Sequence, residues 1–314
     1  MQRVIVFGKT KKTTKKVAHI ARAFIEQGHE TLWLNPARIK RKKKEEADKY
    51  ILKCIQDYQP DIIFIVSLDI PLRVLQQVSQ TQIKSVMFYV DNPASQVLPQ
   101  LSQLASQVDY FLATTSWGHY DLYRSYGIKN PIYMTDACDR HDHKIRYPLL
   151  PLWKSDLAFI GAARKDEPRV SLVKKLSSIC KVKTYGKNWN QFGIKPTLSS
   201  VSPWGYARIC GGSKIILGAD QENNIPGYWS NRLWLTLGCG GFLLTNYVPG
   251  MERYFNNREH LVWYHDEQEC ISLVKEFLAK PDERKRIARQ GYEYVHSQHT
   301  FNHFVDRVMQ ICAN

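Results

Sequence analysis

The chain has 314 residues, more than one domain usually holds, so two domains of ordinary size are expected. Hydrophobic residues make up 44% and aromatic residues 12% of it, which is enough to build full cores and excludes a largely disordered chain. The net charge of +15 favours a polyanionic partner, such as nucleic acid, an anionic polymer or an anionic membrane surface.

The seven cysteines are scattered, with no CxxC pair and an odd total. That pattern favours reduced thiols over a disulfide framework or a zinc site. The sequence begins MQRVIVFG, which is typical of a strand rather than of a signal peptide. No apolar run approaches the roughly 18 residues of a membrane span. These features predict a cytoplasmic protein.

In the first half of the chain, short apolar runs alternate with amphipathic stretches. Strands are expected at 4–7, 31–34, 61–66, 85–90, 110–113 and 132–134. Helices are expected at about 17–27, 45–58, 71–79, 98–107 and 118–126. Continuous apolar strands that alternate with helices indicate a doubly wound parallel sheet, covered on both faces.

A proline-broken stretch at 147–153 has the composition of a linker, and the alternation restarts after it. Strands are expected at 157–160, 181–185, 214–217, 242–245 and 261–263. Helices are expected at 168–178, 206–210, 231–238, 267–279, 281–296 and from 302. We predict an α/β protein with Rossmann-like domains at 1–148 and 149–295, and a C-terminal helix at 296–314 that can pack back on the first domain.

Two dense basic runs lie in the first domain, at 9–16 and 38–44. The GKT at 8–10 follows a strand, but a Walker A motif needs a glycine five residues before the GK glycine, and position 3 is arginine. The runs are either solvated loops that serve solubility or anion-binding surfaces. The candidates for binding an acceptor or polyanion are Lys9, Lys11, Lys12, Lys15, Arg41, Lys42 and Lys43.

Several motifs follow one another along the chain. In the second half they are DLAFIGAAR, YGKNW, SKIILG and SNRLWLTLGCGGFLLTNYVPGMERYF; in the first half they are PDIIFIV, MFYVDNP and the ACD at 137–139. Their order resembles that of the CgeB-like (spore-maturation type) glycosyltransferases, which are relatives of the GT-B group. The resemblance implies two facing Rossmann-like domains with a central cleft between them. It also implies a nucleotide sugar, such as a UDP- or GDP-sugar, on the second domain and most of the acceptor site on the first.

The resemblance places the donor-binding residues at matching positions. Gly161 and Arg164 would lie near the diphosphate, Lys187 near the nucleotide or phosphate, and Arg232 beside a phosphate-side turn of two glycines. Fixed cations and N–H dipoles stabilise the charge that a leaving nucleoside diphosphate gains. For the glycine pair alone, a packed helix–strand junction is the alternative. The donor-binding candidates are Gly161, Arg164, Lys187, Arg232, Gly240, Gly241 and Glu252.

One position departs from the family pattern R-x-F-E-A-x-A-C-G-G. Leu235 stands where the family glutamate bonds a ribose hydroxyl, and Gly227, eight residues earlier, is not acidic either. Leucine cannot accept such a bond. Either Glu222, Glu252 or a backbone group replaces the glutamate, or the donor sits differently, or activity has been lost.

Asp91, which follows a strand in the sequence VDNP, is the candidate catalytic base for an acceptor hydroxyl. The alternative is an Asx turn before Pro93. His119 and Asp139 are weaker candidates. GT-B relatives usually work without a metal, so we assign no metal ligand and expect the HDH at 141–143 to be ordinary surface.

Two functions follow from these patterns. The first is a metal-independent, nucleotide-sugar-dependent glycosyltransferase with no cofactor besides its donor, acting on an acceptor that could be polyanionic, such as modified DNA or an anionic envelope polymer. The second is a catalytically inactive GT-B protein that binds nucleic acid or another polyanion through its lysines.

Overall fold

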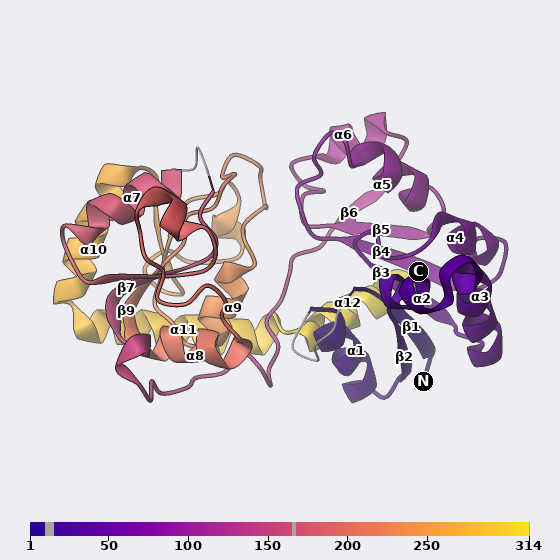
Figure 1. Cartoon of the computed structure of the whole chain (residues 1–314), viewed down its shortest axis with the longest axis horizontal. Coiled ribbons are helices and arrows are strands. Elements are labelled where there is room, and N and C mark those ends of the chain that lie inside the picture. The colour runs from indigo at the N-terminus through magenta and orange to yellow at the C-terminus, as the bar shows by residue number, and fades with distance from the viewer. Residues whose placement is uncertain (10–15, 165–167, 314) are drawn as a thin grey trace. The chain divides into compact units, whose positions relative to one another are not determined.

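The computed structural model describes residues 1–9, 16–164 and 168–313. These residues form two compact units, each with its own sheet (Figure 1). Unit 1 comprises Met1–Asp136 and Phe301–Asn314, and unit 2 comprises Ala137–Thr300. The sequence places the division at residue 148, whereas the compact units divide at Asp136 and the last helix groups with unit 1.

Unit 1 is built on a parallel six-stranded sheet with the order β2-β1-β3-β4-β5-β6. Its strands are β1 (Arg3–Phe7), β2 (Glu30–Leu34), β3 (Ile62–Val66), β4 (Lys84–Tyr89), β5 (Tyr110–Ala113) and β6 (Pro131–Tyr133). Its helices are α1 (Lys16–Glu26), α2 (Pro36–Lys43), α3 (Ala47–Tyr58), α4 (Leu72–Val78), α5 (Leu98–Ala105), α6 (Tyr120–Ser125) and α12 (Phe301–Ala313).

Both faces of this sheet are covered because side chains of a strand point alternately to opposite faces. One face presents Ile63 and Met87 to a core that α3, α4 and α5 complete. The other presents Phe64 and Phe88, whose rings lie 6.0 and 4.9 Å from that of Phe304 on α12. In Figure 1 the yellow α12 runs beside the indigo α1, against which it packs. The helix at the end of the chain is thus part of the core of unit 1.

The second basic run forms a helix that the sequence analysis leaves unassigned. Asn35 caps α2 through a hydrogen bond from the Arg38 N–H to its side-chain oxygen at 3.0 Å, and Pro36 occupies the first turn. Lysine and arginine are good helix formers. An Asn-Pro pair before a cationic run is therefore a helix-start signal. Most of the second basic run lies on this one exposed helix.

Unit 2 contains a parallel five-stranded sheet with the order β11-β10-β9-β7-β8. Its strands are β7 (Ser155–Ile160), β8 (Val182–Tyr185), β9 (Ser213–Leu217), β10 (Leu243–Asn246) and β11 (Val262–Tyr264). Its helices are α7 (Pro168–Ser177), α8 (Pro203–Gly212), α9 (Arg232–Gly238), α10 (Glu267–Ala279) and α11 (Pro281–Gln298). The predicted fold class, α/β with two Rossmann-like parallel-sheet domains, is confirmed.

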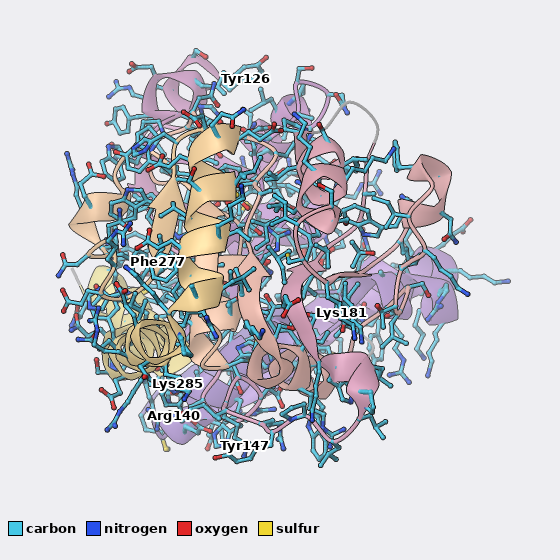
Figure 2. All side chains as sticks on the ribbon, turned by 90° about the vertical axis from the view of Figure 1, so that its left-hand side faces the viewer. Tyr126, Arg140, Tyr147, Lys181, Phe277 and Lys285 are labelled. Atoms are coloured by element: carbon cyan, nitrogen blue, oxygen red, sulfur yellow. The ribbon has the colours of Figure 1, made fainter. Side chains whose placement is uncertain are left out.

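The sheet of unit 2 also has a core on each face. Ala158 and Ile216 join residues of α8 and α9 on one side, and Phe159 and Leu217 join residues of α7 and α10 on the other. Phe277 of α10, labelled in Figure 2, is fully buried in the second of these cores. Among the described residues, no helix combines the length and the apolar character needed to cross a bilayer.

Candidate functional site

The carboxyl ends of β7 and β9 meet at the centre of the unit 2 sheet. The chain leaves β7 for β8 on one side and later returns to β9 on the other, so the order of strands reverses between these two strands. In open α/β sheets, ligands bind outside the carboxyl ends of strands at such a reversal. Gly161 follows β7 there, and Gly218 follows β9.

Arg232, the first residue of α9, is buried at this reversal. Its Nε donates to the carbonyl oxygen of Ile160 at 2.9 Å, and its Nη1 donates to Asp220 Oδ1 at 3.1 Å. Its guanidinium also lies 4.8 Å from the centre of the Phe159 ring. The side chains of Arg232 and Asp220 are only 10% and 8% exposed, so this is a buried ion pair.

Asp220 links the carboxyl ends of β9, β10 and β7 through hydrogen bonds. Its Oδ2 accepts from the Ser230 N–H at 2.9 Å, and its own N–H donates to Asn246 Oδ1 at 2.7 Å. Through Arg232 it is also joined to the end of β7. Asp220 is not among the residues predicted from the sequence. Its signal is a carboxylate two residues after the glycine of SKIILG, at the end of a strand.

The loops after β7 and β8 touch backbone to backbone. Gly161 N–H donates to the Tyr185 carbonyl oxygen at 2.7 Å, and Ala163 N–H donates to the Lys187 carbonyl oxygen at 3.0 Å. Gly186 has φ +142°, and a Cβ at that position would lie 2.1 Å from the Gly161 carbonyl oxygen. Only glycine fits there, since other residues avoid this φ and carry the clashing atom.

The predicted donor-binding cations lie around these loops. Arg164 and Lys187 are exposed, and Arg164 Nη1 donates to Gln221 Oε1 at 2.9 Å, next to Asp220. The structure thus brings Gly161, Arg164, Lys187 and Arg232 to one edge of the sheet. Asp220 balances the charge of Arg232, and Arg164 and Lys187 are exposed cations at the same edge.

Glu252 follows β10 at the same edge. Its Oε2 accepts from the Tyr247 hydroxyl at 2.9 Å. The pKa of Glu252 is lowered, first by a hydrogen bond from its own backbone N–H and also by the Tyr247 hydroxyl, so the exposed carboxylate is ionised at neutral pH. Leu235, in contrast, packs against the apolar core of unit 2.

Gly240 and Gly241 end α9 at the opposite edge of the sheet, before β10 begins. Gly240 N–H donates to the Leu237 carbonyl oxygen and Gly241 N–H to that of Thr236, both at 2.9 Å, while Gly240 has φ +69°. This pattern is a Schellman cap. Because the cap uses both N–H groups, neither is available to a diphosphate, and we leave the pair out of the donor site proposed below.

In unit 1, Asp91 is exposed just beyond the carboxyl end of β4. The neighbouring Asn92 Oδ1 lies 2.7 Å from Nε2 of His119, which belongs to the segment after β5. The structure therefore brings two of the candidate bases, Asp91 and His119, to the same edge of the unit 1 sheet.

The candidate polyanion-binding residues of unit 1 are spread over two places. Lys9 lies just after β1, where its Nζ is 3.6 Å from Asp69 Oδ1. Arg41, Lys42 and Lys43 are exposed on α2. Lys11, Lys12 and Lys15 lie outside the described residues.

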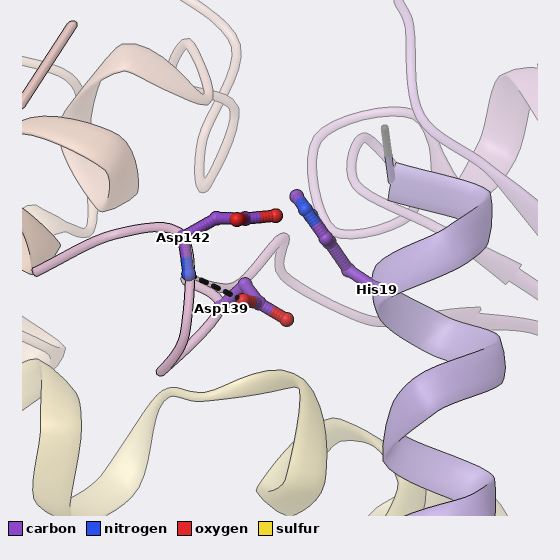
Figure 3. Close-up of side chains that lie close together, drawn as sticks. All are labelled: His19, Asp139 and Asp142. Carbon is purple, nitrogen blue, oxygen red and sulfur yellow. Dashed lines mark hydrogen bonds between the residues drawn. The ribbon is translucent and has the colours of Figure 1, made fainter. Parts of the chain in front are cut away.

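Asp139 belongs to a tight turn in unit 2. Its Oδ1 accepts from the N–H group of Asp142 at 2.8 Å, the bond drawn in Figure 3, and from that of His141 at 3.0 Å. The N–H of Asp139 donates to His143 Nδ1 at 2.8 Å. Asp142 and His143 are buried, so the expectation that the HDH at 141–143 is surface is wrong for these two residues. Asp139 Oδ1, the Asp139 N–H and His143 Nδ1 all take part in hydrogen bonds within the turn. The third side chain drawn in Figure 3, His19, belongs to α1 of unit 1.

Comparison with known protein families gives one match. Residues 164–310 match the family model described as "Glycosyl transferase-like", which takes in most of unit 2 and much of α12. No curated protein sequence matches the chain.

Solved structures with a similar fold cover the whole chain. An α-glucosyltransferase in complex with UDP and a 13-mer DNA containing an HMU base aligns with a TM-score of 0.74 at 12% identity, over 100% of both chains. A sucrose-phosphate synthase from Thermosynechococcus elongatus gives 0.66 at 12% identity, over 100% of this chain and 98% of that one. The Anabaena HepE protein in complex with UDP and glucose gives 0.64 at 10% identity, over 99% and 100%. The chain shares the fold of these solved structures over its whole length.

Proposed function

We propose that this protein is a glycosyltransferase that moves a sugar from a nucleotide-sugar donor to an acceptor hydroxyl, and that it is of the CgeB-like kind. One observation carries the proposal. The part of the chain that matches a glycosyltransferase-like family model contains Arg164, Lys187 and Arg232, which lie with Gly161 at the strand reversal of the unit 2 sheet.

Each group at this edge has a role in the proposed donor site. Lys187 and Arg164 bind the diphosphate and stabilise the negative charge that it gains as the glycosidic bond breaks. Arg232, held by Asp220 and the Ile160 carbonyl, acts as a positioning residue that shapes the loop at Gly161. Glu252 supplies a carboxylate that can accept a ribose hydroxyl bond in place of the glutamate that Leu235 replaces. Since lysine and arginine provide the positive charge, the proposal needs no metal and no cofactor besides the donor.

On the acceptor side, we assign the base to Asp91 and the binding of a polyanionic acceptor to Lys9 and α2. The exposed cations of α2 concentrate positive charge on one short helix, which attracts phosphates. The α-glucosyltransferase of similar fold was solved with DNA. Modified DNA is therefore one proposed acceptor, and an anionic envelope polymer is another.

Replacing Lys187 by alanine is expected to weaken donor binding about tenfold, because an exposed lysine–phosphate contact is worth roughly 1.4 kcal/mol. A thermal-shift screen over UDP-, GDP-, CDP- and TDP-sugars identifies the donor, since a ligand raises the melting temperature by mass action. The Lys187→Ala variant should then need about tenfold more donor for the same shift.

Lys181→Ala is the matched control for Lys187→Ala. Lys181 is also exposed, but it lies just before β8, at the amino end of the strand (Figure 2). Its loss should leave the shift unchanged. If no sugar nucleotide shifts the unaltered protein, or if both lysine variants lose the shift equally, the donor site is wrongly placed.

Asp91→Asn is expected to lower kcat for sugar transfer about 100-fold while donor affinity stays the same, because a positioned general base contributes about 100-fold or more. Donor affinity should not change, since Asp91 belongs to unit 1 and the proposed donor site to unit 2. Asp57→Asn, an exposed carboxylate on α3, is the control. If Asp91→Asn transfers sugar at the unaltered rate, Asp91 is not the base. His119 would then be the next residue to replace.

The second candidate function, an inactive GT-B protein that binds a polyanion, is favoured by Leu235, an apolar residue that packs against the core at the position where the family has a carboxylate. It predicts binding of duplex DNA that weakens steeply with salt, and no transfer or hydrolysis of any sugar nucleotide. Donor binding in the thermal-shift screen, followed by transfer, would exclude it.

A further inference from the structure

We propose that unit 2 carries a surface that binds an anionic lipid bilayer, formed by Ile145, Tyr147, Leu149, Leu150 and Trp204 and called here the strap surface. This proposal does not depend on the proposed enzymatic function. Every residue that it uses belongs to unit 2.

The segment from Arg146 to Trp153 lies directly on α8. A Cβ at Gly211 would lie 2.1 Å from the Arg146 carbonyl oxygen, and one at Gly212 would lie 2.3 Å from that of Trp153. The two glycines of α8 therefore allow the backbone of this segment to approach the helix closely. At its far end, Lys183 Nζ donates to the carbonyl oxygens of Pro151 and Leu152 at 2.8 and 3.1 Å. The segment is a fixed part of the surface of unit 2.

This packing leaves large apolar side chains in solvent. Tyr147 is 82% exposed and Leu149 is 68% exposed, while Ile145, Leu150 and Trp204 are each 51% exposed. Trp204, on α8, is joined to the segment by Arg146, whose guanidinium lies 4.2 Å from the centre of the indole. Figure 2 shows Tyr147 at the lower edge of the unit that faces the viewer. Exposed apolar side chains gathered in this way mark an interaction site.

The surroundings of the strap surface are positively charged. Residues 144–155 contain three lysines and arginines and no acidic residue, and residues 168–219 contain nine and no acidic residue. Asp156, Asp166 and Glu167 lie between these stretches, and Asp156 is paired with Lys214 at 2.8 Å. Lys144 and Lys154 flank the apolar side chains and are exposed. A surface of this charge attracts anionic lipid headgroups.

The aliphatic side chains distinguish a bilayer from the other polyanions. Nucleic acids bind aromatic side chains by stacking, which leucine and isoleucine cannot provide. At a bilayer, leucine and isoleucine enter the boundary of the acyl chains, tyrosine and tryptophan lie at headgroup level, and lysine and arginine reach back to the headgroups. A second copy of the chain fits poorly, because a symmetric contact would bring the same cations face to face.

Co-sedimentation with lipid vesicles tests the proposal. The full chain should bind vesicles of phosphatidylcholine mixed with phosphatidylglycerol, and bind vesicles of phosphatidylcholine alone much more weakly. The double variant Leu149→Ser with Leu150→Ser should reduce binding about tenfold or more, because the apolar area that enters the boundary is lost. Lys144→Gln with Lys154→Gln should reduce it about fivefold for each charge removed.

The controls are Ile25→Ser and Ile179→Ser, which remove exposed isoleucines from α1 and from the turn after α7. Vesicle binding should persist in both. Failure of the unaltered protein to bind anionic vesicles, or equal binding by the Leu149→Ser, Leu150→Ser variant, would overturn the proposal. Gel filtration tests whether the strap surface binds a second copy of the chain instead. Self-association that the Leu149→Ser, Leu150→Ser variant abolishes would also overturn the bilayer proposal.

Discussion

Replacing Arg232 by methionine is expected to lower the free energy of unfolding of unit 2 by about 3–5 kcal/mol. Arg232 and Asp220 are both buried, and removing the cation leaves the Asp220 carboxylate buried without its charge partner. The replacement also leaves the Ile160 carbonyl oxygen without the Nε donor. Urea unfolding, followed by a probe that reports on unit 2, measures the effect.

A second replacement separates stability from donor binding. In Arg232→Met with Asp220→Leu both charges of the pair are removed, and an apolar pair in place of a buried ion pair is often no less stable. Much of the lost stability should therefore return. Donor affinity should remain at least about tenfold below that of the unaltered protein, since the guanidinium no longer shapes the loop at Gly161. Full recovery of donor affinity would limit Arg232 to a purely structural role.

Gly186→Ala is expected to cost about 3–5 kcal/mol of stability and to abolish donor binding. The φ of +142° strains any residue with a Cβ, and that Cβ would lie 2.1 Å from the Gly161 carbonyl oxygen, which is backbone and cannot rotate away. Because Gly161 lies in the proposed donor site, the shift needed to relieve the clash displaces a binding loop. Denaturant unfolding and the thermal-shift screen report the two effects.

Gly193→Ala provides the matched control for Gly186→Ala. Gly193 has φ +75°, but a Cβ there meets nothing within 4 Å. Its replacement should cost only the backbone strain, about 1 kcal/mol, and leave donor binding unchanged. Equal losses in the two variants would mean that the contact with Gly161 is unimportant.

The strands could be predicted from the sequence because each is a short, continuous apolar run buried on both faces. The run at Ile62–Val66 is an example, since all five of its residues are buried. The helix α8 was harder to see, because three of its ten residues are glycine, which lowers helix propensity. The helix Pro203–Gly212 is predicted only at 206–210, although Ser202 caps it by accepting from the Gly205 N–H.

The candidate site was predicted only in part, for a physical reason. The family resemblance grouped Gly161, Arg164 and Lys187, and all three follow parallel strands, whose carboxyl ends gather at one edge of the sheet. The partner of Arg232 depends on which strands are neighbours, and β7 and β9 are far apart in the sequence. Whether Gly240 and Gly241 cap a helix or bind an anion depends on hydrogen bonds at the end of that helix. A glycine pair in the sequence is compatible with either a cap or an anion site.

The place of α12 in the core of unit 1 has a consequence for biosynthesis. Unit 2 is one continuous stretch of chain, whereas unit 1 takes its remaining helix from residues that follow unit 2. During translation the core of unit 2 can close first, while Phe64 and Phe88 still lack their partner Phe304. Until α12 emerges from the ribosome, the nascent first unit exposes an aromatic sheet face, which is the kind of surface that chaperones cover.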